Sequence, residues 1–105
     1  MQGFQLTFFT QQDHSHHGKP LGHWLVEEAR KMGIGGATLL AASEGFGHHR
    51  RLHSAHFIEL SDQPLEVVMA VTAEEADQLF AKLKVEKIRL FYCKSPVEFG
   101  TTYEE

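Results

Sequence analysis

The chain has 105 residues, a formal charge of −4 and 42% hydrophobic residues. This length and composition predict one globular domain with a single core, and they exclude an intrinsically disordered chain. The mildly acidic balance excludes the basic surface typical of nucleic-acid-binding proteins, so we expect no nucleic-acid partner.

The cysteine content and the N-terminal residues indicate the compartment. Cys93 is the single cysteine, which excludes an internal disulfide and suits a reducing environment. Residues 1–6 contain neither the basic segment nor the long apolar stretch that a signal peptide or a membrane span requires. We therefore expect a cytoplasmic protein without membrane insertion.

The first half of the chain predicts a strand, a loop, a helix and a second strand. Apolar and polar residues alternate over residues 4–8, which is typical of a half-buried strand. Residues 11–18 are polar and rich in histidine, so we expect a loop. Pro20 suits the first turn of a helix, whose apolar residues recur at helical spacing until Gly33 ends it. The apolar run at residues 37–43 predicts a buried strand.

The second half predicts one strand with an interruption, then a helix and a last strand. Residues 54–60 have strand character, and either a turn or a bulge at residues 61–64 separates them from residues 65–71. The latter alternate while remaining apolar on both faces near their middle, as a central strand does. Thr72 followed by Glu75 is a capping box that begins the second helix. Residues 88–93 then predict a strand.

This order of elements predicts an α+β fold. We expect a ferredoxin-like β-α-β-β-α-β subunit, with a four-stranded antiparallel sheet and two helices on one face. Residues 1–105 form a single domain, of which residues 95–105 are a polar C-terminal tail. Two helices cannot cover both faces of such a sheet, so we expect self-association through the open face. A closed ring of three subunits is geometrically reasonable, but periodicity does not determine the number.

The segment from Gly45 to His53 concentrates groups that suit an anion. Gly45 and Gly47 lack a Cβ, so the backbone can turn sharply and approach a ligand closely. The arginines and histidines that follow supply hydrogen-bond donors and positive charge for a group such as phosphate. Arg50 and Arg51 are adjacent, so in an extended segment only one of them faces a given ligand. The alternative is a tight hairpin whose basic side chains are merely solvated.

Three motifs together carry a family resemblance. They are Gly18-Lys19-Pro20-Leu21, Lys31-Met32-Gly33-Ile34-Gly35-Gly36-Ala37-Thr38 and Gly45-Phe46-Gly47-x-His49-x-Arg51-x-His53. In this order and spacing, the chain resembles the PII-like proteins once grouped as a domain of unknown function. Those proteins are related in fold to the PII nitrogen regulators and to the CutA family. The resemblance covers roughly residues 3–93.

The resemblance implies a small signalling regulator rather than an enzyme. It implies a ferredoxin-like homotrimer that binds an adenine nucleotide or a similar anionic effector in clefts between subunits. The Gly45–His53 segment would correspond to the base of the T-loop. Effector binding would order or reposition it, and a partner protein such as a transporter or a metabolic enzyme would respond to that change. The ligand-binding residues that the resemblance implies are Gly45, Phe46, Gly47, His49, Arg51 and His53.

Three departures from the PII pattern bear on the effector. Ala41 and Ala42 stand where relatives often have Arg-Gly, and residues 84–88 lack the glycine-rich phosphate loop of true PII proteins. The loop is also shorter than a full T-loop and lacks its modifiable tyrosine. AMP, ADP, ATP and cyclic nucleotides are all candidates, but a monophosphate, diphosphate or cyclic nucleotide fits this chain better than a triphosphate. No required cofactor is expected.

The alternative from another functional class is a metal-binding or metal-tolerance protein of CutA type. His14, His16 and His17 follow Asp13, and imidazole and carboxylate groups suit zinc, copper or nickel. A solvated loop is the simpler interpretation of this run, and the four-residue spacing of His49 and His53 guarantees no shared geometry. A structural trimer with a vestigial site is a third possibility.

Catalysis has little support. Cys93 has no base placed to activate it, so we expect a buried thiol in a strand, and Trp24 fits the core. No phosphate-binding Walker motif, serine triad or zinc-hydrolase motif occurs in the chain.

Overall fold

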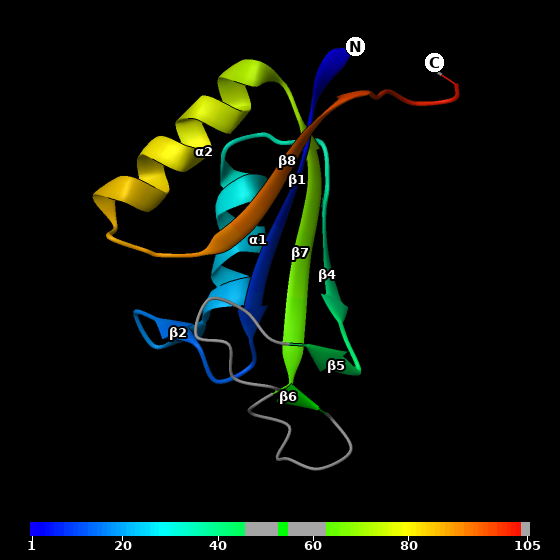
Figure 1. Cartoon of the computed structure of the whole chain (residues 1–105). Helices are drawn as coiled ribbons and strands as arrows, with labels where there is room; N and C mark the ends of the chain where they lie inside the picture. Colours follow the sequence, from blue (N-terminus) through cyan, green and yellow to red (C-terminus); the bar gives the residue numbers. More distant parts are fainter. Residues whose placement is uncertain (46–52, 55–62, 104–105) are drawn as a thin grey trace.

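The protein folds around one four-stranded antiparallel sheet. The computed structural model describes residues 1–45, 53–54 and 63–103. The sheet has the strand order β4–β7–β1–β8, and two short two-stranded ladders accompany it (Figure 1). The elements in chain order are β1 (Gln2–Gln11), β2 (Ser15–His16), β3 (Lys19–Pro20), α1 (Leu21–Lys31), β4 (Ala37–Ala41), β5 (Glu44–Gly45), β6 (His53–Ser54), β7 (Pro64–Val71), α2 (Ala73–Val85) and β8 (Phe91–Glu98). The predicted α+β, ferredoxin-like subunit is therefore confirmed.

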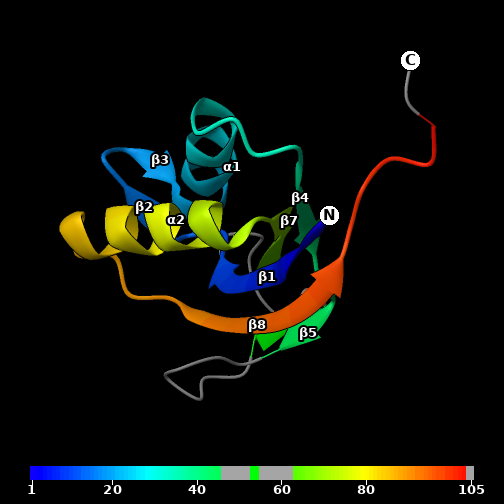
Figure 2. The same ribbon diagram turned by 90° about the horizontal axis from the view of Figure 1, so that it is seen from above.

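Both helices cover the same face of the sheet. Figure 2 shows α1 and α2 on one side of β1 and β8. Leu6, Phe8, Val67 and Val71 point to that side and are fully buried, and every second residue of β7 is buried in the same way. The ring of Phe8 lies 5.8 Å from that of Phe80 on α2. The strict alternation is what a sheet with one covered face requires.

Local sequence signals set the helix ends as expected. Gly33 follows α1 with φ +80°, and Ile34 donates its N–H to the carbonyl of Ala29 at 3.0 Å, which closes a Schellman motif. At the start of α2, the Thr72 side chain accepts from the Glu75 N–H, and the Glu75 side chain accepts from the Thr72 N–H. The predicted capping box is confirmed.

Several boundaries differ from the predictions. The strand at residues 37–43 ends at Ala41 and is half exposed rather than buried, because β4 is an edge strand paired only with β7. Pro20 pairs in β3, and α1 begins one residue later. The last strand starts at Phe91 and runs to Glu98, so it includes the first part of the predicted tail. It continues because Glu98 pairs with Gln2 of β1. Most of the predicted strand at 54–60 lies outside the described residues.

Within the described residues, no helix lies on the second face of the sheet. Phe9 pairs with Phe91 there, and their rings lie 5.5 Å apart. Cys93 pairs with Thr7 on the same face and is exposed, so the prediction of a buried thiol was wrong. The reason is that β8 is an edge strand whose non-helix side nothing covers within the described part of the chain. No helix in that part is long and apolar enough to cross a membrane.

We predict that Thr72→Ala lowers the free energy of unfolding by about 1 kcal/mol, because the N–H of Glu75 loses its acceptor. Chemical denaturation measures the difference. Thr101→Ala, at an exposed position after β8, is the matched control and should have almost no effect. Equal losses in the two variants would contradict a specific role for the capping box.

Candidate functional site

The chemically distinctive segments of the chain leave the sheet at one end. Gln11 at the end of β1 pairs with Pro64 at the start of β7, and Ala41 at the end of β4 pairs with Leu65. Phe91 at the start of β8 pairs with Phe9. The connections β1–α1, β4–β7 and α2–β8 therefore all meet this end (Figure 1). The first connection contains His14, His16 and His17. The second contains the segment from Gly45 to His53, called the glycine-arginine loop below, and the third is the turn after α2.

Two of the predicted ligand-binding residues form the base of the glycine-arginine loop. Gly45 of β5 pairs with His53 of β6, and Glu44 pairs with Ser54 in the same antiparallel ladder. Backbone pairing thus holds Gly45 beside His53, close to the end of the sheet. The other four predicted residues, Phe46, Gly47, His49 and Arg51, lie outside the described residues.

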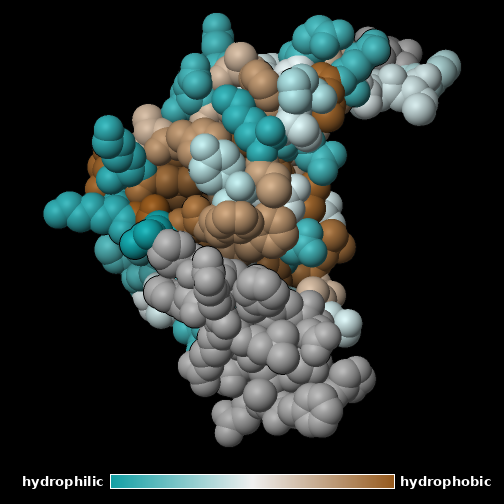
Figure 3. Space-filling model, in the orientation of Figure 1, coloured by the Kyte–Doolittle hydropathy of each residue, from teal (hydrophilic) through white to brown (hydrophobic). Residues whose placement is uncertain are grey.

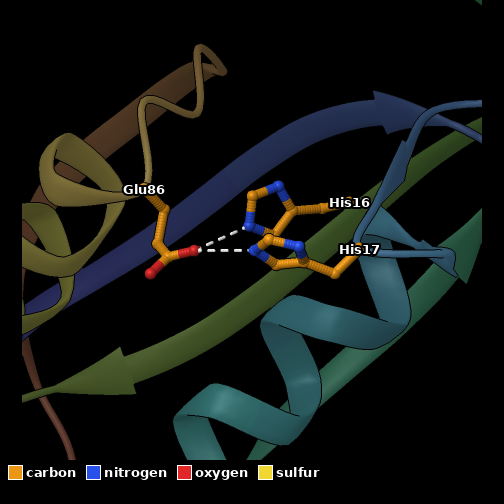
Figure 4. A group of neighbouring side chains, drawn as sticks. All are labelled: His16, His17 and Glu86. Carbon is orange, nitrogen blue, oxygen red and sulfur yellow. Dashed lines mark hydrogen bonds and ion pairs between the residues drawn. The ribbon is translucent and has the colours of Figure 1, made fainter.

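His16 and His17 converge on a carboxylate from the far end of the chain. The Nε2 atoms of His16 and His17 lie 2.8 and 3.3 Å from Oε1 of Glu86, the residue that caps the C-terminus of α2 (Figure 4). The two imidazole centroids are 4.1 Å apart. His14 is not part of this cluster, because its Nδ1 lies 3.3 Å from the Thr10 hydroxyl. The prediction of a purely solvated loop is therefore wrong for His16, which is largely buried.

Unusual backbone conformations hold both sides of the cluster. His17 and Gly18 have φ of +51° and +78° between the paired residues His16 and Lys19, as the two central residues of a type I′ hairpin turn require. Neighbouring residues of an extended strand point to opposite sides. The positive φ of His17 breaks that alternation, and both imidazoles lie together.

The end of α2 has the second such conformation. Lys87 has φ +58° and follows Glu86, while Ile88 donates to the Leu83 carbonyl at 3.0 Å in a Schellman motif. Among the described residues, His17 and Lys87 are the non-glycine residues with positive φ. Each lies in one of the two segments that supply the cluster.

The surroundings of Glu86 favour its ionised form. The hydrogen bond from His16 lowers the pKa of the Glu86 carboxyl; desolvation opposes that shift, while the His17 hydrogen bond and the positive charge of Lys82 add to it. Lys82 Nζ lies 3.6 Å from the second oxygen of Glu86 and also 3.6 Å from Glu28. A carboxylate oxygen is thus free to face the imidazoles while its partner oxygen is held from the other side.

Sequence reasoning missed Glu86. It is 69 residues from His17 and lies at the end of an amphipathic helix, where an acidic residue has no special meaning by itself. Its position at the C-cap, where helix dipoles disfavour negative charge, is the one signal that could have marked it.

A shallow apolar groove of about 330 Å³ lies between α2 and β8 (Figure 3). Phe80 and Tyr92 contribute aromatic rings with centroids 4.7 Å apart. Lys84 and Arg89 are the cationic residues of its lining. Such a groove offers flat apolar surface next to positive charge.

Comparison with known families identifies the chain. The family DUF190, described as an uncharacterized ACR, matches residues 3–89. The chain belongs to DUF190. A curated relative in this range is a UPF0166 protein of Aquifex aeolicus strain VF5, which is 34% identical over 70 residues. That alignment spans 67% of this chain and 66% of the relative's length.

Solved structures show that this DUF190 chain has the PII-like fold. CPII, a nitrogen regulatory PII-like protein from Thiomonas intermedia K12 bound to ADP, AMP and bicarbonate, superposes with a TM-score of 0.70 and 15% identity over 96% of this chain and 91% of CPII. A PII-like signaling protein from Thermus thermophilus gives 0.67 and 19% over 91% and 87%. The resemblance inferred from the three motifs is confirmed.

We predict that Lys87→Gly stabilises the protein by about 0.5–1 kcal/mol, because glycine adopts the left-handed conformation without Cβ strain. Lys84→Gly, in the last turn of α2, is the control of opposite sign and should lose about 1 kcal/mol. Thermal and urea unfolding measure both changes. Destabilisation by Lys87→Gly would show that the Lys87 side chain makes a contact worth more than the strain.

Proposed function

We propose that this protein is a small homotrimeric regulator. It binds an adenine nucleotide or a similar anionic effector in clefts between subunits and signals the bound state to a partner protein. We infer that it is a non-catalytic regulator of the cytoplasm, where an exposed cysteine such as Cys93 stays reduced.

The observation that carries the proposal is the PII-like fold together with the Gly45–His53 motif, whose two ends pair in the β5–β6 ladder. Gly45 and His53, from the most specific of the three motifs, pair at the end of the sheet. CPII, which shares the fold, binds two adenine nucleotides, ADP and AMP. That agrees with the expectation that a mono- or diphosphate suits this chain better than a triphosphate. Arg51 would pair with the phosphate, while His49 and His53 would add hydrogen bonds.

The uncovered face of the sheet supports self-association. Its exposed apolar residues include Leu40, at 47% exposure, and Phe91, at 55% exposure. Leu40 pairs with Glu66, whose neighbours Leu65 and Val67 point to the helices, so Leu40 faces away from the helices. Apolar surface of this kind on a small domain favours burial against further copies. A cleft between two such copies would lie beside the sheet end at which the three connections meet.

The groove between α2 and β8 suits one part of a nucleotide. Phe80 and Tyr92 offer rings on which a purine base can stack, and Lys84 and Arg89 offer charge to phosphate. This groove would form one wall of the effector cleft.

We predict that AMP, ADP or cyclic AMP binds in calorimetric titrations and that ATP binds more weakly. Arg51→Ala should reduce the affinity at least about tenfold, since a hydrogen bond to a charged group is worth about 1.5–3 kcal/mol. Arg50→Ala is the matched control, because Arg50 points to the opposite side in an extended segment. Failure of all four nucleotides to bind, or equal losses in both variants, would refute this effector site.

We predict that light scattering coupled to size exclusion gives a mass near 36 kDa, three copies of the 11.9 kDa chain. Phe91→Glu should dissociate the assembly because it places a charge on the uncovered face. Val85→Glu is the control: Val85 is 75% exposed at the end of α2, away from that face. A clean monomer of the unmodified chain would remove the basis for a site between subunits.

A further inference from the structure

We propose that His16, His17 and Glu86 form a binding site for a divalent transition-metal ion of the zinc class. The ligands are Nε2 of both imidazoles and one carboxylate oxygen. None of the three residues belongs to the Gly45–His53 segment, and the proposed site does not rest on the proposed nucleotide-binding function.

The three ligand atoms have nearly the spacing of a metal centre. They all lie within 4.8 Å of one another, and the two nitrogens lie 2.8 and 3.3 Å from Oε1 of Glu86. Zinc ligands at about 2.0–2.1 Å in a tetrahedron are about 3.3 Å apart. An ion can therefore enter with small side-chain shifts at His16 and Glu86.

The site is organised before the ion arrives. The ring of His16 packs edge-on against Trp24, with centroids 4.9 Å apart, so its orientation is fixed by the core. Glu86 is held at the end of α2 and is 22% exposed. His17 is turned toward the same oxygen by its positive φ. Strained backbone that brings functional groups together is common at binding sites.

A purely structural role explains only part of this arrangement. The contact between His16 and Glu86 alone would tie the β2–β3 hairpin to α2. His17 is 74% exposed, and its Nε2 faces the same oxygen of Glu86. An exposed polar pair of this kind adds little stability in water. A shared ion would explain why the imidazole of His17 also lies at this oxygen although the backbone of His17 is strained.

Surrounding charges are compatible with a cation. Lys82 binds the second oxygen of Glu86 and is itself shared with Glu28, whose other neighbour is Lys31 at 3.3 Å. Lys82 thus orients the carboxylate from outside, as partners of metal ligands usually do. Its ammonium group contacts the carboxylate oxygen that the imidazoles do not use.

The donor set selects the ion. Two imidazoles and one carboxylate suit Zn²⁺, Ni²⁺, Co²⁺ or Cu²⁺, whereas Mg²⁺ and Ca²⁺ prefer sites made of oxygen. Three protein ligands leave at least one coordination position of the ion unfilled. Water can reach that position because His17 lies at the surface.

The decisive experiment titrates the untagged full chain with Zn²⁺ by calorimetry while following tryptophan fluorescence. Trp24 is the single tryptophan and lies against His16, so its emission reports on this site. We expect one ion per chain, a saturable change in emission, and no competition from millimolar Mg²⁺. His17→Asn and Glu86→Gln should each weaken Zn²⁺ binding at least about tenfold. Asparagine tolerates positive φ, so His17→Asn preserves the turn.

The control variants remove an imidazole or a carboxylate outside the proposed site. His23→Asn and Glu74→Gln, both at exposed helix positions, should bind Zn²⁺ like the unmodified chain. Absence of binding at a large excess of Zn²⁺ over protein would overturn the site. So would binding that His17→Asn and Glu86→Gln leave unchanged, since the ion would then lie at other residues. Loss of Zn²⁺ binding with nucleotide binding retained would show that the two sites are distinct.

Discussion

The pairing of β1 with β7 positions every chemically distinctive segment of this chain. Leu6 and Phe8 pair with Met69 and Val67, and all four are buried beneath the helices. A shift of one residue in this register would turn these side chains to the uncovered face, so the core admits one register. With that register, Gln11 lies beside Pro64. The connections that carry the histidine cluster and the glycine-arginine loop consequently leave the sheet at the same end.

The second constraint is that two helices cover only one face. As a consequence, the edge strands β4 and β8 expose Leu40, Phe91 and Cys93 to solvent. A domain of this size gains by burying such surface against copies of itself. The proposed effector clefts depend on that assembly. The histidine-glutamate cluster does not, because one chain supplies all three of its groups. The two proposed sites can therefore fail independently.

Backbone strain distinguishes the cluster from an ordinary surface contact. His17 and Lys87 both adopt positive φ, and each adjoins or belongs to the group formed by His16, His17 and Glu86. Gly33 ends α1 with the same Schellman geometry without strain. The chain thus uses glycine at one helix end and lysine at the other, and the strained end is the one that presents Glu86.

Local sequence determined the elements and the family. The alternation of β1 and β7, the capping box of Thr72 and Glu75 and the stop at Gly33 each act over a few residues, and so does the Gly45–His53 motif. Such short-range signals can be read without the fold. The extension of β8 to Glu98, the exposure of Cys93 and the meeting of His16 with Glu86 were decided by tertiary structure. Each depends on which strand or helix from a distant part of the chain lies alongside. The local sequence of one segment does not indicate which distant segment it will contact.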